Sequence, residues 1–379
     1  MIAGPSRIGA KSRPLPSRAP RLVRVSSLAD LLNGTSGFCL YRADCRQALR
    51  DIPDHFVDSV GTDSPYEIDF LKKGWDRTGV SYDVGLWKEV RRVTKPGGYL
   101  LAFAATRTAH RVVCAIEDAG WEIRDQLGWL YSTGFTKVGY IRDRDGSCVA
   151  PGWGGSLKPA MELICLARKP CEGTVAQNLA KYGTGALHID PCRVELPPGD
   201  PLHKGVRHKR RKLDTKGRGY GFVALDRQPG LARWPANVLH DQSEEVLETL
   251  AAYGATGAFF QSCPFDREDA ALVRIFYSGK ASPRDRNEGL AGLRPATRRV
   301  NDHPTVKPTG LFRYLLRLVT PPGGITLDPF LGSGSSGKAA MLENLRFLGI
   351  EIDPGYFRIA HARIEHARAI STGRATTIS

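Results

Sequence analysis

The chain has 379 residues and a formal net charge of +15 at pH 7, with 41% hydrophobic and 25% charged residues. This length is enough for one large core with a smaller appended domain, and the composition is ordinary for a globular protein. No apolar run approaches the ~20 residues that a membrane-spanning helix needs, which argues against an integral membrane protein.

The charge favours a polyanionic partner such as nucleic acid, although a merely soluble basic surface would give the same excess. The eight cysteines are scattered, with no C-x-x-C pair and no histidine spacing typical of zinc. We therefore expect reduced, mostly buried thiols in a cytoplasmic protein and no metal site.

Residues 1–30 begin the chain with a segment rich in Arg, Lys, Pro and Ser, and no acidic residue precedes Asp30. Such a composition predicts a disordered basic arm that contacts phosphates. A transit peptide has a similar composition and stays an alternative.

From Gly37 onward, short apolar segments alternate with amphipathic ones, which predicts a mostly parallel α/β sheet. The expected strands are residues 38–42, 57–61, 99–104, 122–131, 162–168, 274–279, 325–327 and 347–352. Two expected helices carry apolar residues at three- and four-residue spacing, in residues 84–93 and 311–319. Residues 31–170 and 241–379 are the two predicted halves of this α/β domain.

Between these halves the alternation lapses, which predicts an insertion over residues 171–240. Residues 203–218 hold eight Lys or Arg against one Asp. We expect this run to contact DNA, as a target-recognition surface or a phosphate clamp, while a solvated loop is the alternative. The candidate DNA-binding residues are Lys204, Arg207, Lys209, Arg210, Arg211 and Lys212.

A carboxylate, a stiff bend and an aromatic ring follow the expected strand at residues 57–61, in the sequence Asp63-Ser64-Pro65-Tyr66. A carboxylate can accept a hydrogen bond from the amine of a flat base, and an aromatic ring can stack on its face. These four residues are therefore the candidate catalytic segment.

A second segment, from Asp328 to Ser335, runs from a strand through a glycine-serine loop into a helix. A helix start of this kind presents backbone N–H groups to an anion. The segment lacks the G-x-x-x-x-G-K-[ST] pattern, which argues against an ATP or GTP site. Glu351 ends the next expected strand 23 residues after Asp328, where an acid can accept both hydroxyls of a ribose. The alternative for Glu351 is a cap of the helix that starts near Pro354.

Three segments together resemble those of the amino-group DNA methyltransferases: Asp63-Ser64-Pro65-Tyr66, His303-Pro304-Thr305-Val306-Lys307-Pro308 and Asp328-Pro329-Phe330-Leu331-Gly332-Ser333-Gly334-Ser335. These enzymes transfer a methyl group from S-adenosyl-L-methionine to N6 of adenine or N4 of cytosine. Their order here, catalytic before cofactor segment, is similar to the permuted β-type arrangement. Four further stretches resemble phage and prophage members: residues 74–76, 134–137, 183–187 and 233–237. The resemblance implies a Rossmann-like, seven-stranded methyltransferase sheet and covers roughly residues 38–367.

The resemblance also implies catalytic roles. Asp63 and the carbonyl of Ser64 would each accept a hydrogen bond from the base amine, which directs its lone pair at the methyl group. Tyr66 would stack on a base that has left the duplex. Trp129 and Tyr131 are candidate walls of the base pocket, with ordinary core packing as the alternative.

On the cofactor side, the resemblance implies a cofactor-binding set of Asp44, Thr305, Lys307, Asp328, Phe330, Gly332, Ser333, Gly334, Ser335 and Glu351. Phe330 and the glycine-serine backbone would hold the methionine moiety, and Thr305 and Lys307 would meet its carboxylate. Asp44 matches an acidic position near the cofactor adenine, although a helix cap before Gln47 is the alternative.

One position departs from the family pattern, which usually reads Asp-Pro-Pro-Tyr or Ser-Pro-Pro-Tyr. Ser64 replaces a proline that would fix φ near about −65°, so the segment is less preorganised. This leaves open a catalytically silent DNA-binding homologue. Asp63 at the first position favours adenine over cytosine, by resemblance alone.

We therefore expect a site-specific DNA methyltransferase, bacterial or phage-encoded, whose partner is double-stranded DNA. An RNA methyltransferase is the remaining competitor. The recognition sequence, the oligomeric state and any cognate restriction nuclease are not encoded in a readable pattern.

Overall fold

The computed structural model describes residues 23–132, 134, 140–194, 234–241, 248, 261–262, 281–293 and 300–374. Its core is a ten-stranded sheet with the order β1-β2-β10-β9-β3-β4-β6-β5-β7-β8. The strands are β1 (Val23–Val25), β2 (Phe38–Arg42), β3 (Val57–Thr62), β4 (Thr94–Ala104), β5 (Glu122–Leu130), β6 (Met161–Arg168), β7 (Val238–His240), β8 (Gln261–Ser262), β9 (Ile325–Asp328) and β10 (Arg346–Glu351).

Seven central strands form the expected methyltransferase sheet. Strands β2, β10, β9, β3 and β4 pair in parallel, and β6 is antiparallel to both β4 and β5. Strand β1 adds to one edge, and β7 and β8 add to the other. The prediction of a Rossmann-like, mostly parallel sheet is confirmed.

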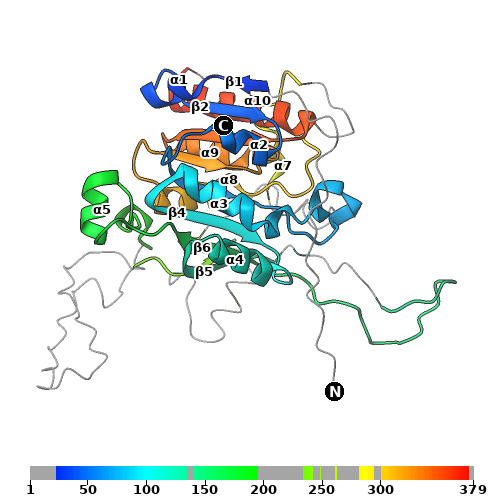
Figure 1. Ribbon diagram of the computed structural model, residues 1–379. Coiled ribbons are helices and arrows are strands. Elements are labelled where there is room, and N and C mark those ends of the chain that lie inside the picture. Colours follow the sequence, from blue (N-terminus) through cyan, green and yellow to red (C-terminus); the bar gives the residue numbers. More distant parts are fainter. Residues whose placement is uncertain are drawn as a thin grey trace, which may run out of the picture.

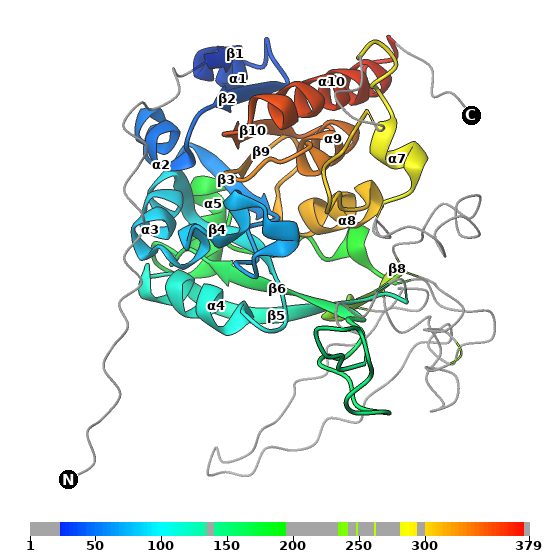
Figure 2. The ribbon, with the colours of Figure 1, turned by 90° about the vertical axis from the view of Figure 1, so that its right-hand side faces the viewer.

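Helices cover both faces of the sheet (Figures 1 and 2). They are α1 (Leu28–Asn33), α2 (Cys45–Ala48), α3 (Val84–Val93), α4 (Ala109–Asp118), α5 (Val175–Tyr182), α7 (Pro283–Asn287), α8 (Thr309–Val319), α9 (Ser335–Leu342) and α10 (Pro354–Ser371). Side chains of α1 to α4 pack into one buried apolar cluster, and those of α8 to α10 pack into a second one. The two predicted helices are α3 and α8.

Helix α3 illustrates how the sequence specifies these elements. Asp83 caps the helix by accepting hydrogen bonds from Gly85 N at 2.8 Å and Leu86 N at 3.4 Å. Trp87 and Val90 then lie on the buried face at helical spacing.

Two predicted boundaries were wrong. The disordered arm was expected to reach residue 30, but Val23–Val25 pairs with β2, and Ser27 and Asp30 form a capping box at the start of α1. The insertion was expected over residues 171–240, but α5 and β7 within it belong to the main body. Asn178 of α5 donates to the Pro96 carbonyl at 2.9 Å, and β7 pairs with β5.

Residues 1–22, the strand predicted at residues 274–279 and the basic run at residues 203–218 lie outside the described residues. Within the described part of the chain, all cysteines are free thiols, and those in β2, α2, β6 and residue 192 are buried. The same residues include no helix with the length and apolar character needed to cross a bilayer.

Candidate active site

A cavity of about 940 Å³ lies beyond the carboxyl ends of β3, β9 and β10. Ligands of open α/β sheets bind in this position. The predicted site residues that line it are Asp44, Asp63, Ser64, Pro65, Tyr66, Tyr131, Thr305, Lys307, Asp328, Phe330, Gly332, Ser333, Ser335 and Glu351. The catalytic and cofactor segments therefore meet, because β3 and β9 are parallel neighbours although they lie far apart in sequence.

Asp63 forms a buried ion pair with Lys307. Lys307 Nζ lies 2.5 Å from Asp63 Oδ2, and the lysine side chain is 1% exposed. Burial lowers the pKa of Lys307, and the nearby Asp63 opposes this effect. The other oxygen, Asp63 Oδ1, is buried and has no hydrogen-bond partner among the described residues. An unsatisfied acceptor in a cavity is suited to a donor from a ligand.

The same lysine lies over an aromatic ring. Its Nζ is 5.1 Å from the centre of the Tyr66 ring and 4.9 Å from that of Phe103. The predicted contact between Lys307 and the cofactor carboxylate stays a prediction, because the described neighbours of the ammonium group lie on the catalytic side.

Glu162, at the start of β6, joins this cluster and was not predicted as a site residue. Its side chain is 4% exposed and lies 3.6 Å from Lys307 Nζ. It accepts a hydrogen bond from the Tyr66 hydroxyl at 2.6 Å and one from Tyr131 at 3.5 Å. Glu162 therefore fixes the ring of Tyr66, and burial raises the pKa of that phenol well above its ordinary value. The signal in the sequence was an acid at the start of an otherwise apolar strand.

Asp76 holds the backbone that follows the catalytic segment. Its carboxylate, 1% exposed as a residue, accepts hydrogen bonds from Tyr66 N at 2.8 Å, Glu67 N at 3.0 Å, Ile68 N at 3.3 Å and Phe70 N at 2.7 Å. Four donors from one loop make this carboxylate the organising centre of the loop. Sequence reasoning noted residues 74–76 only as a resemblance and gave Asp76 no role.

Ser64 is held by its own side chain. Its Oγ donates to the Phe103 carbonyl on β4 at 2.8 Å, and the residue is 1% exposed. In addition, Ser81 Oγ donates to the Pro65 carbonyl at 2.7 Å. These bonds restrain a segment in which Ser64 stands at the position of the first of the two usual prolines, so tertiary contacts take over the restraint that this proline ring would supply.

The two predicted aromatic walls differ in position. Tyr131 lines the cavity, whereas Trp129 is completely buried in the apolar cluster beneath it. Their ring centres are 5.0 Å apart. Trp129 therefore has the core-packing position that was the alternative, and it supports Tyr131 from behind.

Glu351 lines the cavity at the end of β10. Its Oε2 accepts from Gly332 N and its Oε1 from Asp353 N, both at 2.7 Å. Burial raises the pKa of Glu351 to about 8, and these two hydrogen bonds oppose the rise. The cap of α10 is Asp353, which accepts from Gly355 N and Tyr356 N. Glu351 is thus not the helix cap.

Asp328 connects the two segments. It accepts hydrogen bonds from the Thr62 hydroxyl at 2.6 Å, from Phe330 N at 2.9 Å and from the Ser336 hydroxyl. Burial raises the pKa of Asp328 to about 6, and the two hydroxyls and the N–H oppose this. Although Asp328 lines the cavity, its hydrogen bonds in the structure all serve the protein itself.

Two further cofactor candidates, Asp44 and Thr305, contact neighbouring residues of the protein. Asp44 caps α2 through Arg46 N at 2.9 Å and pairs with the Arg46 guanidinium at 2.7 Å, so the predicted alternative of a cap is present. Thr305 N lies 3.4 Å from His303 Nδ1. The His303 ring stacks on Trp75 with centres 6.0 Å apart and meets Tyr356 edge-on at 4.6 Å. Burial lowers the pKa of His303 to about 3, so this ring is neutral.

Close packing explains the glycines of the loop. Gly334 has φ +84°, and a Cβ there would lie 2.8 Å from Ala360 of α10, so only glycine fits. Gly334 precedes α9 and does not line the cavity. Arg363 of α10, fully buried, donates to the Ser333 carbonyl at 2.7 Å.

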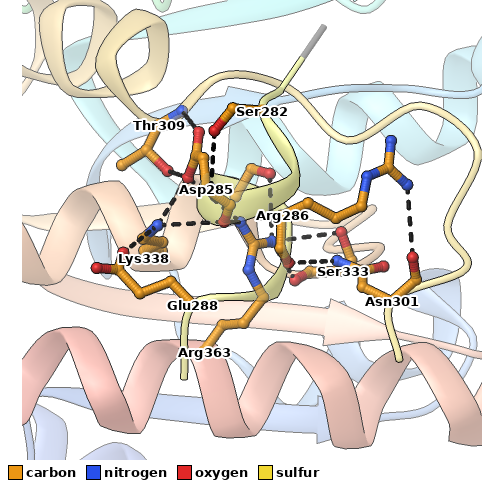
Figure 3. A network of polar contacts seen from close by, with 10 residues as sticks. Ser282, Asp285, Arg286, Glu288, Asn301, Thr309, Ser333, Lys338 and Arg363 are labelled. Carbon is orange, nitrogen blue, oxygen red and sulfur yellow. Dashed lines mark hydrogen bonds and ion pairs between the residues drawn. The ribbon is translucent and has the colours of Figure 1, made fainter. Parts of the chain in front are cut away.

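A network of charges fastens this loop to α7 (Figure 3). Lys338 Nζ lies 2.7 Å from Asp285 Oδ1 and 2.6 Å from Glu288 Oε2. Arg363 lies 3.8 Å from Asp285, which also accepts from Thr309 N at 2.8 Å. The pKa of Asp285 lies below its usual value. Burial alone would raise this pKa, but the charges of Lys338 and Arg363 outweigh that effect. The network was not predicted, and it couples α7, α8, α9 and α10 behind the cavity.

The donor set of the cavity fits the expected cofactor. Glu351 presents a carboxylate whose oxygens each use one hydrogen bond, which leaves lone pairs for hydroxyl donors. Phe330 and Tyr356 add aromatic rings to the lining of the cavity. By contrast, the six candidate DNA-binding residues from Lys204 to Lys212 lie outside the described residues.

The chain is similar to several known proteins. Residues 57–362 match the family model of the N6/N4 methyltransferases, described as DNA methylase. The chain is 22% identical over 377 residues to the type II methyltransferase M.HindIII of Haemophilus influenzae, covering 86% of this chain and 94% of that one. It is 38% identical over 66 residues to the DNA adenine methyltransferase YhdJ of Escherichia coli, covering 17% and 22%. The solved structure of the cytosine-N4-specific PvuII DNA methyltransferase is similar with a TM-score of 0.42 and 13% identity, over 89% of this chain and 94% of that one. Since the family model spans most of the chain, this protein belongs to the DNA methylase family.

Proposed function

We propose that this protein methylates the N6 amine of adenine at specific sites in double-stranded DNA. The single observation that carries the proposal is Asp63, whose buried Oδ1 has no hydrogen-bond partner among the described residues and whose carboxylate lies in the cavity. An exocyclic amine is a donor of matching chemistry, and it can reach this acceptor only if the base leaves the duplex.

S-adenosyl-L-methionine, when bound, supplies the methyl group. Similar proteins have been solved with this cofactor bound, among them M1.HpyAVI. Glu351 would accept the ribose hydroxyls, and Phe330 with the backbone of residues 332–335 would hold the methionine moiety. Asp44, which also lines the cavity, would lie near the adenine of the cofactor.

The chain's own residues then prepare the amine. Asp63 and the Ser64 carbonyl each accept a hydrogen bond from one N–H of the amine, which draws the nitrogen away from conjugation with the ring and exposes its lone pair. Tyr66 stacks on the base, with its hydroxyl held by Glu162 at 2.6 Å. Lys307 pairs with Asp63 and holds its carboxylate in place. No covalent intermediate is needed.

Adenine is favoured over cytosine because Asp63, not Ser, begins the catalytic segment, and because a similar relative is described as a DNA adenine methyltransferase. Incubation with labelled cofactor and unmethylated genomic DNA, followed by nucleoside analysis, tests the assignment. We expect N6-methyladenine. N4-methylcytosine would identify the other activity of the family, and bound cofactor without incorporation would indicate a silent homologue. Methylation-sensitive sequencing of an expressing host then gives the recognition motif.

The basic run binds phosphates in this proposal. Replacing Lys209, Arg210, Arg211 and Lys212 together with Gln should weaken DNA binding and flatten its salt dependence, by up to about 0.9 unit of log–log slope for each phosphate that is no longer neutralised. Cofactor affinity should stay unchanged. An unchanged salt slope would contradict the proposal and indicate a solvated loop.

A further inference from the structure

An exposed hairpin leaves the sheet between β5 and β6 and returns beside the cavity. It comprises residues 140–158, which we call the 140–158 hairpin. Isolated antiparallel bridges pair Tyr140 with Gly154 and Arg142 with Cys148. Backbone hydrogen bonds join Ile141 N to the Trp153 carbonyl at 3.3 Å and the Ile141 carbonyl to Val149 N at 3.0 Å. The hairpin therefore has internal structure although it makes little contact with the main body.

This hairpin carries the most exposed large apolar side chains of the described part of the chain. Leu157 is 92% exposed and Trp153 is 72% exposed, more than any other large apolar residue in the described part of the chain. Tyr140 at 59% and Val149 at 55% add to them. Large apolar side chains gathered on one exposed element mark an interaction site, because leaving them in water is unfavourable.

Both ends of the hairpin reach the cavity. Gly134 before it, and Pro159, Met161 and Glu162 after it, line the cavity wall. A Cβ at Gly134 would lie only 1.6 Å from the Pro159 carbonyl oxygen, so the two ends lie against each other. In Figure 1 the hairpin (green) projects on the same side as the segment that follows the catalytic residues (light blue). A duplex that delivers a base to Tyr66 would therefore lie next to it.

The charge of the hairpin suits a polyanion as well. Its basic residues, Arg142, Arg144 and Lys158, outnumber the acidic Asp143 and Asp145, in a chain of net charge +15. Asp145 also accepts hydrogen bonds from Ser147 N and from the Ser147 hydroxyl, within the same turn of the hairpin. Exposed aromatic and aliphatic groups between basic side chains are typical of proteins that enter a base stack.

We propose that the 140–158 hairpin enters the duplex at the position that the target base leaves, with Trp153 and Leu157 filling the gap in the stack. The proposal rests on the proposed function, because only an extruded base creates such a gap. Extrusion breaks stacking and pairing, and an apolar group in the vacated space offsets that cost. The hairpin would then lower the barrier to extrusion without touching the reacting atoms.

The test compares Trp153→Ala and Leu157→Ala with the parent protein on two duplexes that carry the recognition motif. One duplex is fully paired, and the other has an abasic site opposite the target base, so that extrusion is already easy. We expect kcat/KM for methyl transfer to fall about tenfold on the paired duplex, in keeping with the stacking of one base. On the abasic duplex we expect at most about a twofold change, because the gap no longer opposes the reaction.

Leu179→Ala on α5 is the matched control, since Leu179 is 45% exposed and lies outside the hairpin. It should leave both rates unchanged. Three outcomes would each overturn the proposal. They are equal losses on the two duplexes, no loss on either duplex, and a loss that a change of oligomeric state in sedimentation explains. If the parent protein methylates both duplexes and the variants match it, only the hairpin inference fails. If the parent methylates neither, the proposed function fails and the hairpin inference with it.

Discussion

Two of the carboxylates that line the cavity, Asp63 and Glu351, are held in opposite ways. Asp63 pairs with the side chain of Lys307, and its loop is organised by Asp76 and Ser64. Glu351 has no ion pair among the described residues and instead accepts two backbone N–H groups from its own half of the chain. On the catalytic wall the Asp63 carboxylate is thus held through side chains, of which Lys307 is distant in sequence, and on the cofactor wall Glu351 is held through backbone N–H groups. We expect substitutions on the two walls to separate turnover from cofactor affinity.

The largest effect is expected for Asp63→Ala. Loss of one preorganised acceptor should reduce kcat for methyl transfer roughly 100- to 1000-fold. Cofactor affinity, measured by calorimetry, should stay within a few-fold, because Glu351 and the loop after β9 are untouched. Asp69→Ala is the control, since Asp69 is 46% exposed and lies in the adjoining loop. A proportional loss of cofactor affinity would show that the two walls are not separate.

Lys307→Met tests which wall this lysine serves. The substitution keeps an apolar stem but leaves Asp63 and Glu162 without their shared cation, and breaking a buried pair costs about 3–5 kcal/mol. We expect kcat to fall roughly 100-fold and the melting temperature to drop, with Lys307→Arg restoring part of both. A raised KM for the cofactor with unchanged kcat would instead assign Lys307 to the cofactor carboxylate.

Glu351→Gln should weaken cofactor binding by roughly 2 kcal/mol through loss of charged hydrogen bonds. The pKa of Glu351 is about 8, and hydroxyl donors favour its charged form. Cofactor affinity should therefore rise as the pH increases toward 8 and level off above it, by at most about tenfold per pH unit. The variant should lose this pH dependence, which calorimetry over a pH series measures.

The same pKa shift has a consequence for folding. Because the folded-state pKa is raised, the stability contributed by the protonated Glu351 is present at low pH and is lost as the pH rises through about 8. Glu351→Gln should remove that part of the decline. Glu365→Gln is the control, with its side chain 48% exposed on α10. An identical pH profile in parent and variant would contradict the assignment.

The smallest effect is expected for Ser64→Ala. It removes the hydrogen bond to the Phe103 carbonyl and should cost about 1 kcal/mol of unfolding free energy. The catalytic segment would be less restrained, so kcat should fall a few-fold with cofactor affinity unchanged. Ser371→Ala removes a similar bond at the exposed end of α10 and serves as control. If the parent protein transfers no methyl group and Ser64→Ala changes neither stability nor cofactor affinity, the protein is better described as a catalytically silent DNA-binding homologue.

The sequence predicted the features that local patterns encode and missed those that depend on contacts between distant residues. The alternation of strands and helices, the loop after β9 and the acid at the end of β10 are local patterns, and the structure brings these residues together as expected. Glu162 was missed because its partner Tyr66 lies 96 residues away. Asp76 was missed because a carboxylate that collects backbone N–H groups leaves no spacing rule in the sequence. Trp129 and Tyr131 looked alike, since alternation places two residues of one strand on the same face.

Asp328 has one more consequence, for the order in which ligands bind. Its carboxylate accepts from Thr62, the residue before Asp63, and from Phe330 and Ser336 of the cofactor loop. Any ligand that steadies the loop at Asp328 also steadies the strand end that carries Asp63. Thermodynamic linkage requires that this coupling be reciprocal, so DNA and cofactor should each tighten the binding of the other by the same factor. The Asp328 carboxylate thus connects the two binding sites in the structure and couples their binding free energies.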